Sequence, residues 1–145
     1  MRLFYVITAV LLLGLAVQSG CSCPMHKSAP AGTQVDPAPQ AAAVVRMTDQ
    51  YTFDPAKVTV HVGDTVEWKN ASQAAHTVTC DPSKAGAAEN VSLPKGAKPF
   101  NSGNIGPGKT FSHTFTVPGL YKYVCIPHEM MAMTGQVDVQ EAAAK

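Results

Sequence analysis

The sequence has few charged residues and no block of either sign. Only 14% of its 145 residues are charged, and eleven Lys and Arg against ten Asp and Glu give a formal net charge of +1. Without a basic stripe the chain lacks the electrostatic footprint of a nucleic-acid binder, and without an acidic block it lacks that of a protein with a strongly cationic partner. We therefore expect no nucleic-acid binding. The length allows one ordinary domain.

The longest apolar run is short for a membrane span. It occupies residues 3–17, about 15 residues, whereas a spanning helix needs roughly 20. Arg2, the apolar run and the small residues that follow it predict a secretory signal over residues 1–20. Cys21 then matches a lipoprotein processing site and is predicted to carry a lipid anchor. Ordinary cleavage near residue 20, which would give a freely soluble product, is the alternative. The predicted location is extracytoplasmic, in the periplasm or at the cell surface.

Residues 21–43 lack the apolar periodicity that buries a core. They are rich in Pro and Ala, with Gly, Ser and Gln between them. Such a composition is typical of a disordered, semi-extended linker, so we expect a tether at this point. The folded domain is predicted over residues 44–141, with a short tail at 142–145.

The predicted domain shows the period-two pattern of β-strands. In residues 58–62 the Val side chains are expected to face a core, while Thr59 and His61 face water. Further strands are predicted at residues 65–68, 75–79, 109–117, 121–125 and 135–139. Turn residues separate these segments at the spacing of a Greek-key β-sandwich or barrel, so the predicted fold class is all-β.

One loop concentrates ligands for a soft metal. Residues 125–133 begin with Cys125, place His128 three residues later and contain three Met. A second histidine, His76, lies about fifty residues upstream at the end of an apolar run. One thiolate, two imidazoles and a weakly held thioether suit a copper ion that carries single electrons. The sequence therefore predicts a copper site.

Several segments of this domain resemble the plastocyanin and pseudoazurin group of cupredoxins. The similar segments are residues 53–60 (FDPAKVTV), 63–70 (GDTVEWKN), 76–78, 118–121 and 125–139. The resemblance covers the domain and neither the leader nor the tether. It implies a monomeric, non-enzymatic type 1 blue copper protein with one ion that alternates between Cu(II) and Cu(I). Such a protein shuttles single electrons between extracytoplasmic redox partners.

The resemblance also implies which sulfur lies on the axis of the site. Met133 gives the longer, plastocyanin-like spacing from His128, and Met131 gives the shorter, amicyanin-like spacing. Met133 begins the Met-x-Gly-x-Val pattern that leads into the last strand of the family, whereas Met131 would leave two extra residues before that strand. The predicted ligands are His76, Cys125, His128 and Met133, and Met131 remains the alternative.

The predicted electron-transfer port surrounds one ligand. His128 is expected to lie near the surface among the apolar residues Pro127, Met130 and Met131. A redox partner would dock transiently on this weakly charged patch, with a contact area below about 1,200 Å². Glu129 beside it is expected to influence the choice of partner.

Aromatic residues and one further histidine are assigned to the core. Trp68, Tyr121 and Tyr123 are expected to pack beneath the metal. His113 has the same strand parity as the phenylalanines on either side of it, so it is expected to be structural.

Two other functions would also use copper. A copper oxidase or nitrite reductase needs a second copper site, and only five His are present, of which two are assigned. A copper delivery or storage protein remains the alternative, because the loop is rich in Met and the tether contains Cys23, Met25 and His26. A disulfide between Cys23 and Cys80 also remains open.

Overall fold

The computed structural model describes residues 40–142, which form nine strands and two short 3₁₀ helices. The strands are β1 (Ala43–Met47), β2 (Phe53–Asp54), β3 (Lys57–His61), β4 (Thr65–Asn70), β5 (Thr79–Cys80), β6 (Phe100–Asn101), β7 (Thr110–Thr114), β8 (Gly119–Val124) and β9 (Thr134–Gln140). The 3₁₀ helices are η1 (Ala88–Asn90) and η2 (Ile126–Met131). The predicted signal, Cys21, the tether up to residue 39 and residues 143–145 lie outside the described part of the chain.

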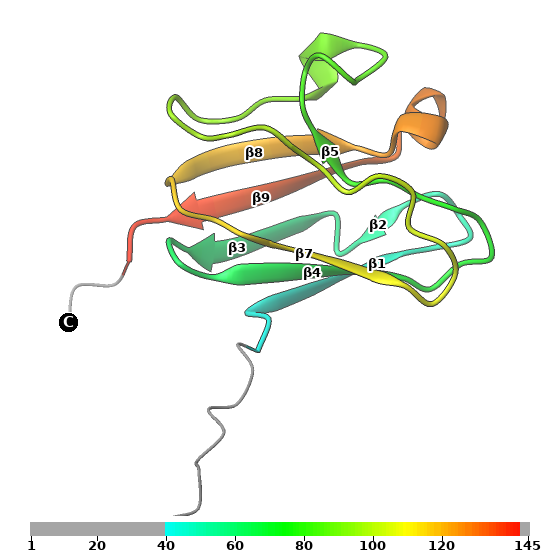
Figure 1. The fold of residues 1–145 in the computed structure, drawn as a ribbon, viewed down its shortest axis with the longest axis horizontal. Helices are drawn as coiled ribbons and strands as arrows, with labels where there is room; N and C mark the ends of the chain where they lie inside the picture. The colour runs from blue at the N-terminus through cyan, green and yellow to red at the C-terminus, as the bar shows by residue number, and fades with distance from the viewer. Residues whose placement is uncertain (1–39, 143–145) are drawn as a thin grey trace, which may run out of the picture. The chain divides into compact units, whose positions relative to one another are not determined.

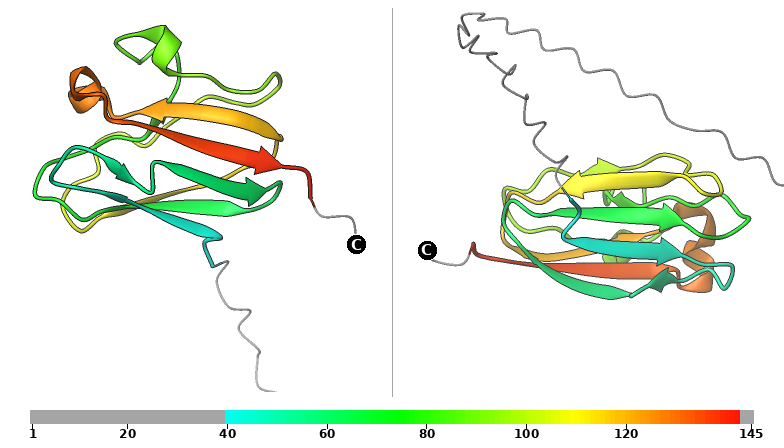
Figure 2. Two further views of the ribbon diagram at one scale, coloured as in Figure 1. Left: turned by 180° about the vertical axis from the view of Figure 1, so that it is seen from behind. Right: turned by 90° about the horizontal axis from the view of Figure 1, so that it is seen from below.

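The strands form two sheets that enclose one core (Figure 1, Figure 2). One sheet has the order β2-β1-β4-β7, and the other has the order β3-β9-β8-β5-β6. Neighbouring strands are antiparallel except in the pairs β1–β4 and β3–β9, which are parallel. This arrangement confirms the predicted all-β sandwich. Between residues 40 and 142, no helix is long and apolar enough to cross a membrane.

The alternation of side chains explains why each strand buries one face. In β3, Val60 is buried and Val58 is half-buried, while Thr59 and His61 are exposed, as predicted. The buried faces of the two sheets meet over aromatic residues. Trp68 lies edge-on to Tyr123, with ring centroids 5.4 Å apart, and burial raises the pKa of the Tyr123 phenol well above its ordinary value. The expected aromatic core is therefore present.

His113 takes the structural place predicted for it. Its ring stacks on Phe100 with a centroid separation of 4.0 Å and lies edge-on to Phe115 at 4.9 Å. Burial among these rings lowers the pKa of His113 below its ordinary value, because the charged form loses solvation. The side chain is therefore an aromatic member of the β7 face.

Cys80 is a buried thiol in β5. Its Sγ lies within hydrogen-bonding distance of the carbonyl oxygens of Ser92 and Lys122, at 3.4 and 3.3 Å, and its one hydrogen can be donated to either. Burial, with a smaller contribution from Asp81, raises the pKa of Cys80 to about 12. It is one of two free cysteines in the described residues. Cys23, with which a disulfide remained open, lies outside the described residues.

The strand predicted at residues 75–79 is shorter than expected. Only Thr79–Cys80 forms a regular strand, and His76 makes an isolated bridge to Ile105. The ladder is interrupted because the N–H of Thr77 is directed to the sulfur of Cys125 rather than to a carbonyl of a neighbouring strand. Irregular pairing here turns the backbone toward the predicted metal loop.

Three connections meet at one end of the sandwich (Figure 1). They are the β1–β2 turn, the segment that follows β4, and η2 between β8 and β9. The predicted ligands lie in the second and third of these connections. The two sheets therefore act as the frame that holds segments distant in sequence beside one another.

The glycine of the Met-x-Gly-x-Val pattern is required by a close aromatic contact. A Cβ on Gly135 would overlap the ring of Tyr123, which pairs with it across β8 and β9. We expect Gly135→Ala to lower the free energy of unfolding of the copper-free protein by about 1–3 kcal/mol, because the buried ring must move. Urea unfolding followed by tryptophan fluorescence measures this change.

Gly106→Ala is the matched control, because a Cβ there meets nothing within 4 Å. Its expected effect is within about 0.5 kcal/mol. Equal effects of the two substitutions would contradict the steric explanation.

Candidate metal centre

Three predicted ligands come together although they are far apart in sequence. The donor atoms of His76, Cys125 and His128 all lie within 4.8 Å of one another. The Cys125 sulfur is 3.6 Å from Nδ1 of His76 and 3.3 Å from Nδ1 of His128. His76 and Cys125 are buried and His128 is half-buried, so the cluster opens to solvent on the side of His128.

The spacing of these atoms fits a shared metal ion. A first-row ion such as zinc holds thiolate sulfur at about 2.3 Å and imidazole nitrogen at about 2.0–2.1 Å, which places the two donors roughly 3.5–3.8 Å apart at tetrahedral to trigonal angles. The two sulfur–nitrogen distances lie in or slightly below this range. One soft sulfur and two imidazoles are also the donor set that suits copper. The residues present therefore fit the predicted ion.

The surroundings of Cys125 favour metal binding over thiol chemistry. Burial raises the pKa of Cys125 above its ordinary value, and the hydrogen bond from the Thr77 N–H to its sulfur, at 3.3 Å, offsets only part of this shift. Cysteines that act as nucleophiles have lowered pKa values and accessible thiolates. This thiol would instead release its proton when a metal binds, because the metal stabilises the thiolate directly.

His76 is held by groups that lie before it in the chain. Its Nε2 is 2.8 Å from Oγ of Ser72, which also contacts the side chain of Asn70 at 2.8 Å. The amide nitrogen of Asn70 donates to the carbonyl oxygens of Ala74 and Ile105. Burial, followed by the neighbouring His128, lowers the pKa of His76, and Asp49 opposes this only weakly. A neutral imidazole is the form that binds metal.

Tyr51 covers His128 from the β1–β2 turn. The two ring centroids are 4.4 Å apart with an interplanar angle of 34°. Tyr51 has φ of +57°, a left-handed conformation that is uncommon for a side chain of this size. Its backbone N–H donates to Thr48, which closes the turn and directs the ring over the imidazole.

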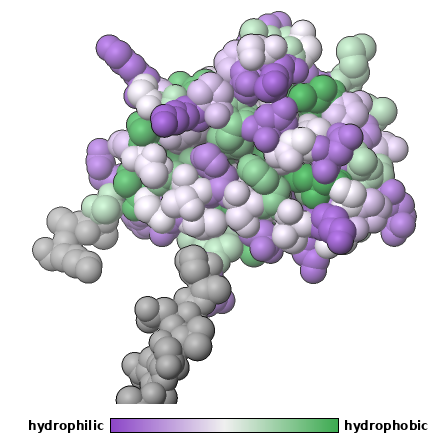
Figure 3. Space-filling view, in the orientation of Figure 1, coloured by the Kyte–Doolittle hydropathy of each residue, from purple (hydrophilic) through white to green (hydrophobic). Residues whose placement is uncertain are grey.

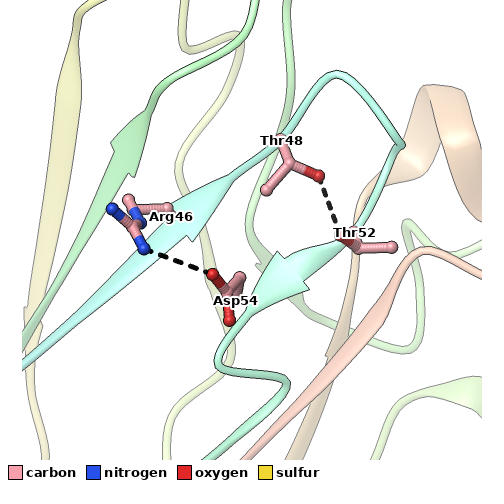
Figure 4. A network of polar contacts seen from close by, with 4 residues as sticks. All are labelled: Arg46, Thr48, Thr52 and Asp54. Carbon is pink, nitrogen blue, oxygen red and sulfur yellow. Dashed lines mark hydrogen bonds and ion pairs between the residues drawn. The ribbon is translucent and has the colours of Figure 1, made fainter.

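Polar contacts on both sides of this turn support its geometry (Figure 4). Arg46 pairs with Asp54 across β1 and β2 at 3.4 Å, and the hydroxyls of Thr48 and Thr52 are 2.8 Å apart. The ion pair is exposed, so its contribution to stability is small. Together these contacts define the register from which the tyrosine projects.

The three Met residues of the loop differ sharply in burial. Met133 is buried, whereas Met131 is 58% exposed and Met130 is fully exposed. The carbonyl of Met133 accepts from the N–H of Cys125 at 3.0 Å, and its N–H donates to the carbonyl of His128 at 3.3 Å. Met133 therefore shares backbone pairing with two of the clustered residues, and it is the only one of the three whose side chain is inside the protein.

The predicted port residues lie on the surface beside the cluster. Pro127, Met130 and Met131 are exposed, and His128 is half-buried. Ile126, which was not among the predicted port residues, is also exposed. On the face shown in Figure 3, hydrophilic and hydrophobic residues are interspersed, in keeping with the low net charge.

Glu129 also has a structural contact that the sequence did not predict. Its carboxylate accepts hydrogen bonds from the N–H groups of Gly86 and Ala87 and from the side chain of Asn90, at 2.7, 3.0 and 2.9 Å. Partial burial pushes its pKa upward, but these hydrogen bonds outweigh that effect and leave the pKa of Glu129 below its ordinary value. The side chain thus joins the loop around η1 to η2, and its effect on the choice of partner stays a prediction.

Comparison with known proteins agrees with this geometry. Residues 40–140 match the model of the family described as copper binding proteins, plastocyanin/azurin family. The chain belongs to this family. A plastocyanin from Prochlorothrix hollandica is 34% identical over 109 residues, covering 71% of this chain and 78% of that protein. A solved Cu(I) form of an amicyanin variant superposes with a TM-score of 0.54 at 31% identity, covering 70% of this chain and 84% of that one.

The relatives differ in how much of their length is matched. The chloroplastic plastocyanin of Oryza sativa subsp. indica is 37% identical over 87 residues, which span 60% of this chain but only 54% of that protein. The common part is the copper-binding domain, so the fold and the cofactor are established together. This protein is a cupredoxin of the type 1 blue copper family, and its cofactor is one copper ion.

Sequence reasoning missed the residues that orient the ligands. Asn70 ends β4 and its side chain is buried, but the sequence assigned it no role. Ser72 is also buried although it lies in a polar segment. Tyr51 had no expected role. A buried Asn and Ser leave no periodic signal, but the spacing of Ser72 four residues before His76 was available as a clue.

The carboxylate of Glu129 offers a direct test of the loop contact. We expect Glu129→Gln to lower the free energy of unfolding by about 1–2 kcal/mol, because either orientation of the amide places an NH₂ group against a backbone or side-chain N–H. Chemical unfolding of the copper-free protein measures the change.

Glu89→Gln is the control, since Glu89 is exposed and lies in the same loop. Its expected effect is within about 0.5 kcal/mol. If Glu129→Gln is equally mild, the contact with the η1 loop does not stabilise the fold.

Proposed function

We propose that this cupredoxin shuttles single electrons between extracytoplasmic redox partners. The observation that carries the proposal is the buried cluster of one thiol and two imidazoles, with the least buried ligand beside exposed apolar residues. When bound, copper supplies a one-electron couple between Cu(II) and Cu(I). The small, weakly charged surface is suited to brief contacts rather than to a stable complex.

The proposed ligands have distinct roles. His76 and Cys125 would hold the ion from the buried side, and both lie in segments tied by backbone hydrogen bonds. His128 would be the third strong donor and is the one nearest solvent. Met133 would supply the weakly held thioether, which its burial and its backbone pairing with Cys125 support. A frame that holds all four in place limits rearrangement between the two oxidation states.

The proposed port is the half-exposed edge of His128. Pro127, Met130 and Met131 give it an apolar rim, and Met side chains adapt well to different surfaces. The Tyr51 ring packs against the imidazole at a centroid separation of 4.4 Å and limits its movement. The docking partner is expected to be a redox protein that presents a similarly apolar patch. The protein is proposed to act as a monomer and not as an enzyme.

The proposed layout of the chain places this domain outside the cytoplasm. Residues 1–20 would act as the signal, Cys21 would carry the lipid, and residues 21–43 would connect the anchor to a domain at 44–141. The supporting observation is the sequence pattern at the N-terminus. The anchor would keep the carrier at a membrane surface in the periplasm or at the cell surface.

Copper delivery or storage is the second candidate function. The fully exposed Met130 and the exposed Met131 are soft donors that could exchange Cu(I). Cys23, Met25 and His26 of the tether add further soft donors. A delivery protein would hold Cu(I) and pass it on without reversible redox cycling.

Copper loading separates these functions. We expect the copper-free protein to bind one equivalent of Cu(II), to turn intensely blue through thiolate-to-copper charge transfer, and to cycle reversibly in voltammetry. Cys125→Ser should abolish the colour, because it removes the thiolate. Absorption spectroscopy during a Cu(II) titration makes the measurement.

Cys80→Ala is the matched control, since it removes the other cysteine of the described residues. The sulfur of Cys80 contacts the carbonyl groups of Ser92 and Lys122 and none of the proposed ligands. This variant should keep the blue colour. A colourless protein that takes up Cu(I) and transfers it to an acceptor would instead support delivery.

The axial assignment can be tested with two methionine variants. We expect Met133→Leu to change the absorption spectrum and raise the reduction potential, because it removes a sulfur from the buried side of the site. Met131→Leu should leave the spectrum unchanged, because this side chain is more than half exposed. Absorption spectra and voltammetry of the copper-loaded variants provide the comparison. The reverse pattern would assign the axial position to Met131.

A further inference from the structure

The hydrogen bonds around Ser72 allow the hydrogen positions to be assigned. Its Oγ lies 2.8 Å from Nε2 of His76, 2.8 Å from Oδ1 of Asn70 and 3.2 Å from the carbonyl of Ala74, and it accepts the Ala74 N–H at 3.2 Å. A serine hydroxyl has one hydrogen to donate and two lone pairs. At most one of the three other contacts can therefore receive that hydrogen.

The orientation of the Asn70 amide is determined independently. Its Nδ2 donates to the carbonyl oxygens of Ala74 and Ile105, at 2.7 and 2.8 Å, which uses both amide hydrogens. Its Oδ1 therefore faces Ser72, where it accepts from the backbone N–H at 2.9 Å as well as contacting the hydroxyl. An amide oxygen can only accept, so the short contact requires the hydrogen of the Ser72 hydroxyl.

The hydroxyl of Ser72 then has only a lone pair left for His76. The imidazole nitrogen 2.8 Å away must donate, which places a hydrogen on Nε2. In a neutral imidazole the other nitrogen is then a bare acceptor. That nitrogen is Nδ1, which faces the sulfur of Cys125 at 3.6 Å. Burial of Ser72 and Asn70 excludes water as a competing partner for this chain of contacts.

We propose that Ser72 is a positioning residue that selects the Nε2–H tautomer of His76 and holds its Nδ1 lone pair toward the copper position. The order of donation is His76 Nε2–H to Ser72 Oγ, and Ser72 Oγ–H to Asn70 Oδ1. This series of hydrogen bonds is fixed to the backbone, because the Asn70 side chain donates to the carbonyl oxygens of Ala74 and Ile105. Ile105 in turn pairs with the backbone of His76. The ligand is thereby oriented before the metal binds. The role toward copper rests on the proposed function of His76.

The tautomer can be observed without copper. Long-range ¹H–¹⁵N correlation spectra of the ¹⁵N-histidine-labelled, copper-free protein at pH 8 distinguish a protonated ring nitrogen from a bare one. In the unsubstituted protein we expect His76 to be protonated at Nε2. Protonation at Nδ1, or an even mixture of tautomers, would overturn the inference. This measurement needs no variant and no metal, so it is independent of whether the proposed function holds.

Variants at Ser72 test the consequence for the metal. Ser72→Ala removes the acceptor, so His76 should become a mixture of tautomers and copper affinity should fall by about 10–100-fold, as for other residues that orient metal-binding histidines. Ser72→Thr keeps the hydroxyl and should restore the single tautomer and most of the affinity. Competition with a chromophoric chelator measures the affinity.

Ser102→Ala is the matched control. The Ser102 hydroxyl accepts the Val78 N–H at 2.8 Å on the segment that follows His76, but it does not contact a ligand. In Ser102→Ala, the tautomer of His76 and the copper affinity should remain those of the unsubstituted protein. An equal loss of affinity in Ser102→Ala and Ser72→Ala, with an unchanged His76 tautomer in both, would show a general structural effect and reject the positioning role. A correct tautomer in a protein that forms no blue complex would reject the proposed function alone.

Discussion

The hydrogen bond from the Thr77 N–H to the Cys125 sulfur is the contact on which the site depends. It occurs where a regular strand would have directed that N–H to a carbonyl, and it joins the segment after β4 to the end of β8. The hydroxyl of Thr77 reinforces the junction by accepting the N–H of Ile126 at 2.8 Å. One interruption in a ladder thus brings a buried sulfur beside an imidazole from a distant part of the chain.

The rest of the site is arranged around this junction by backbone and side-chain hydrogen bonds. The N–H and the carbonyl of His76 both pair with Ile105, and the N–H of Cys125 donates to the carbonyl of Met133. The loop around η1 is held to η2 through Glu129. These hydrogen bonds join protein groups to one another, so the fold itself fixes the segments that carry the donors. A rigid frame of this kind limits movement of the donor groups.

The sequence was sufficient to predict the fold class, the cofactor and the cluster of donors. Period-two alternation is strong where one face of a strand is buried, as in β3 and β4, and the spacing of Cys125 and His128 is a local property. The prediction of a regular strand at residues 75–79 was wrong in length, because the N–H of Thr77 donates to a sulfur and His76 forms only an isolated bridge. Neither partner is visible in the local pattern. The same reason explains why Asn70 and Tyr51 were missed, since their roles depend on which loops meet at the end of the sandwich.

Cys80 illustrates how a second cysteine can coexist with a cysteine that binds a metal. Its sulfur is enclosed by the core and lies within hydrogen-bonding distance of two carbonyl groups, and its pKa of about 12 leaves almost no thiolate at neutral pH. Thiol–disulfide exchange requires a thiolate with access to another sulfur. Burial and the raised pKa of Cys80 both disfavour such exchange, so Cys80 is a poor partner for mispairing with Cys125.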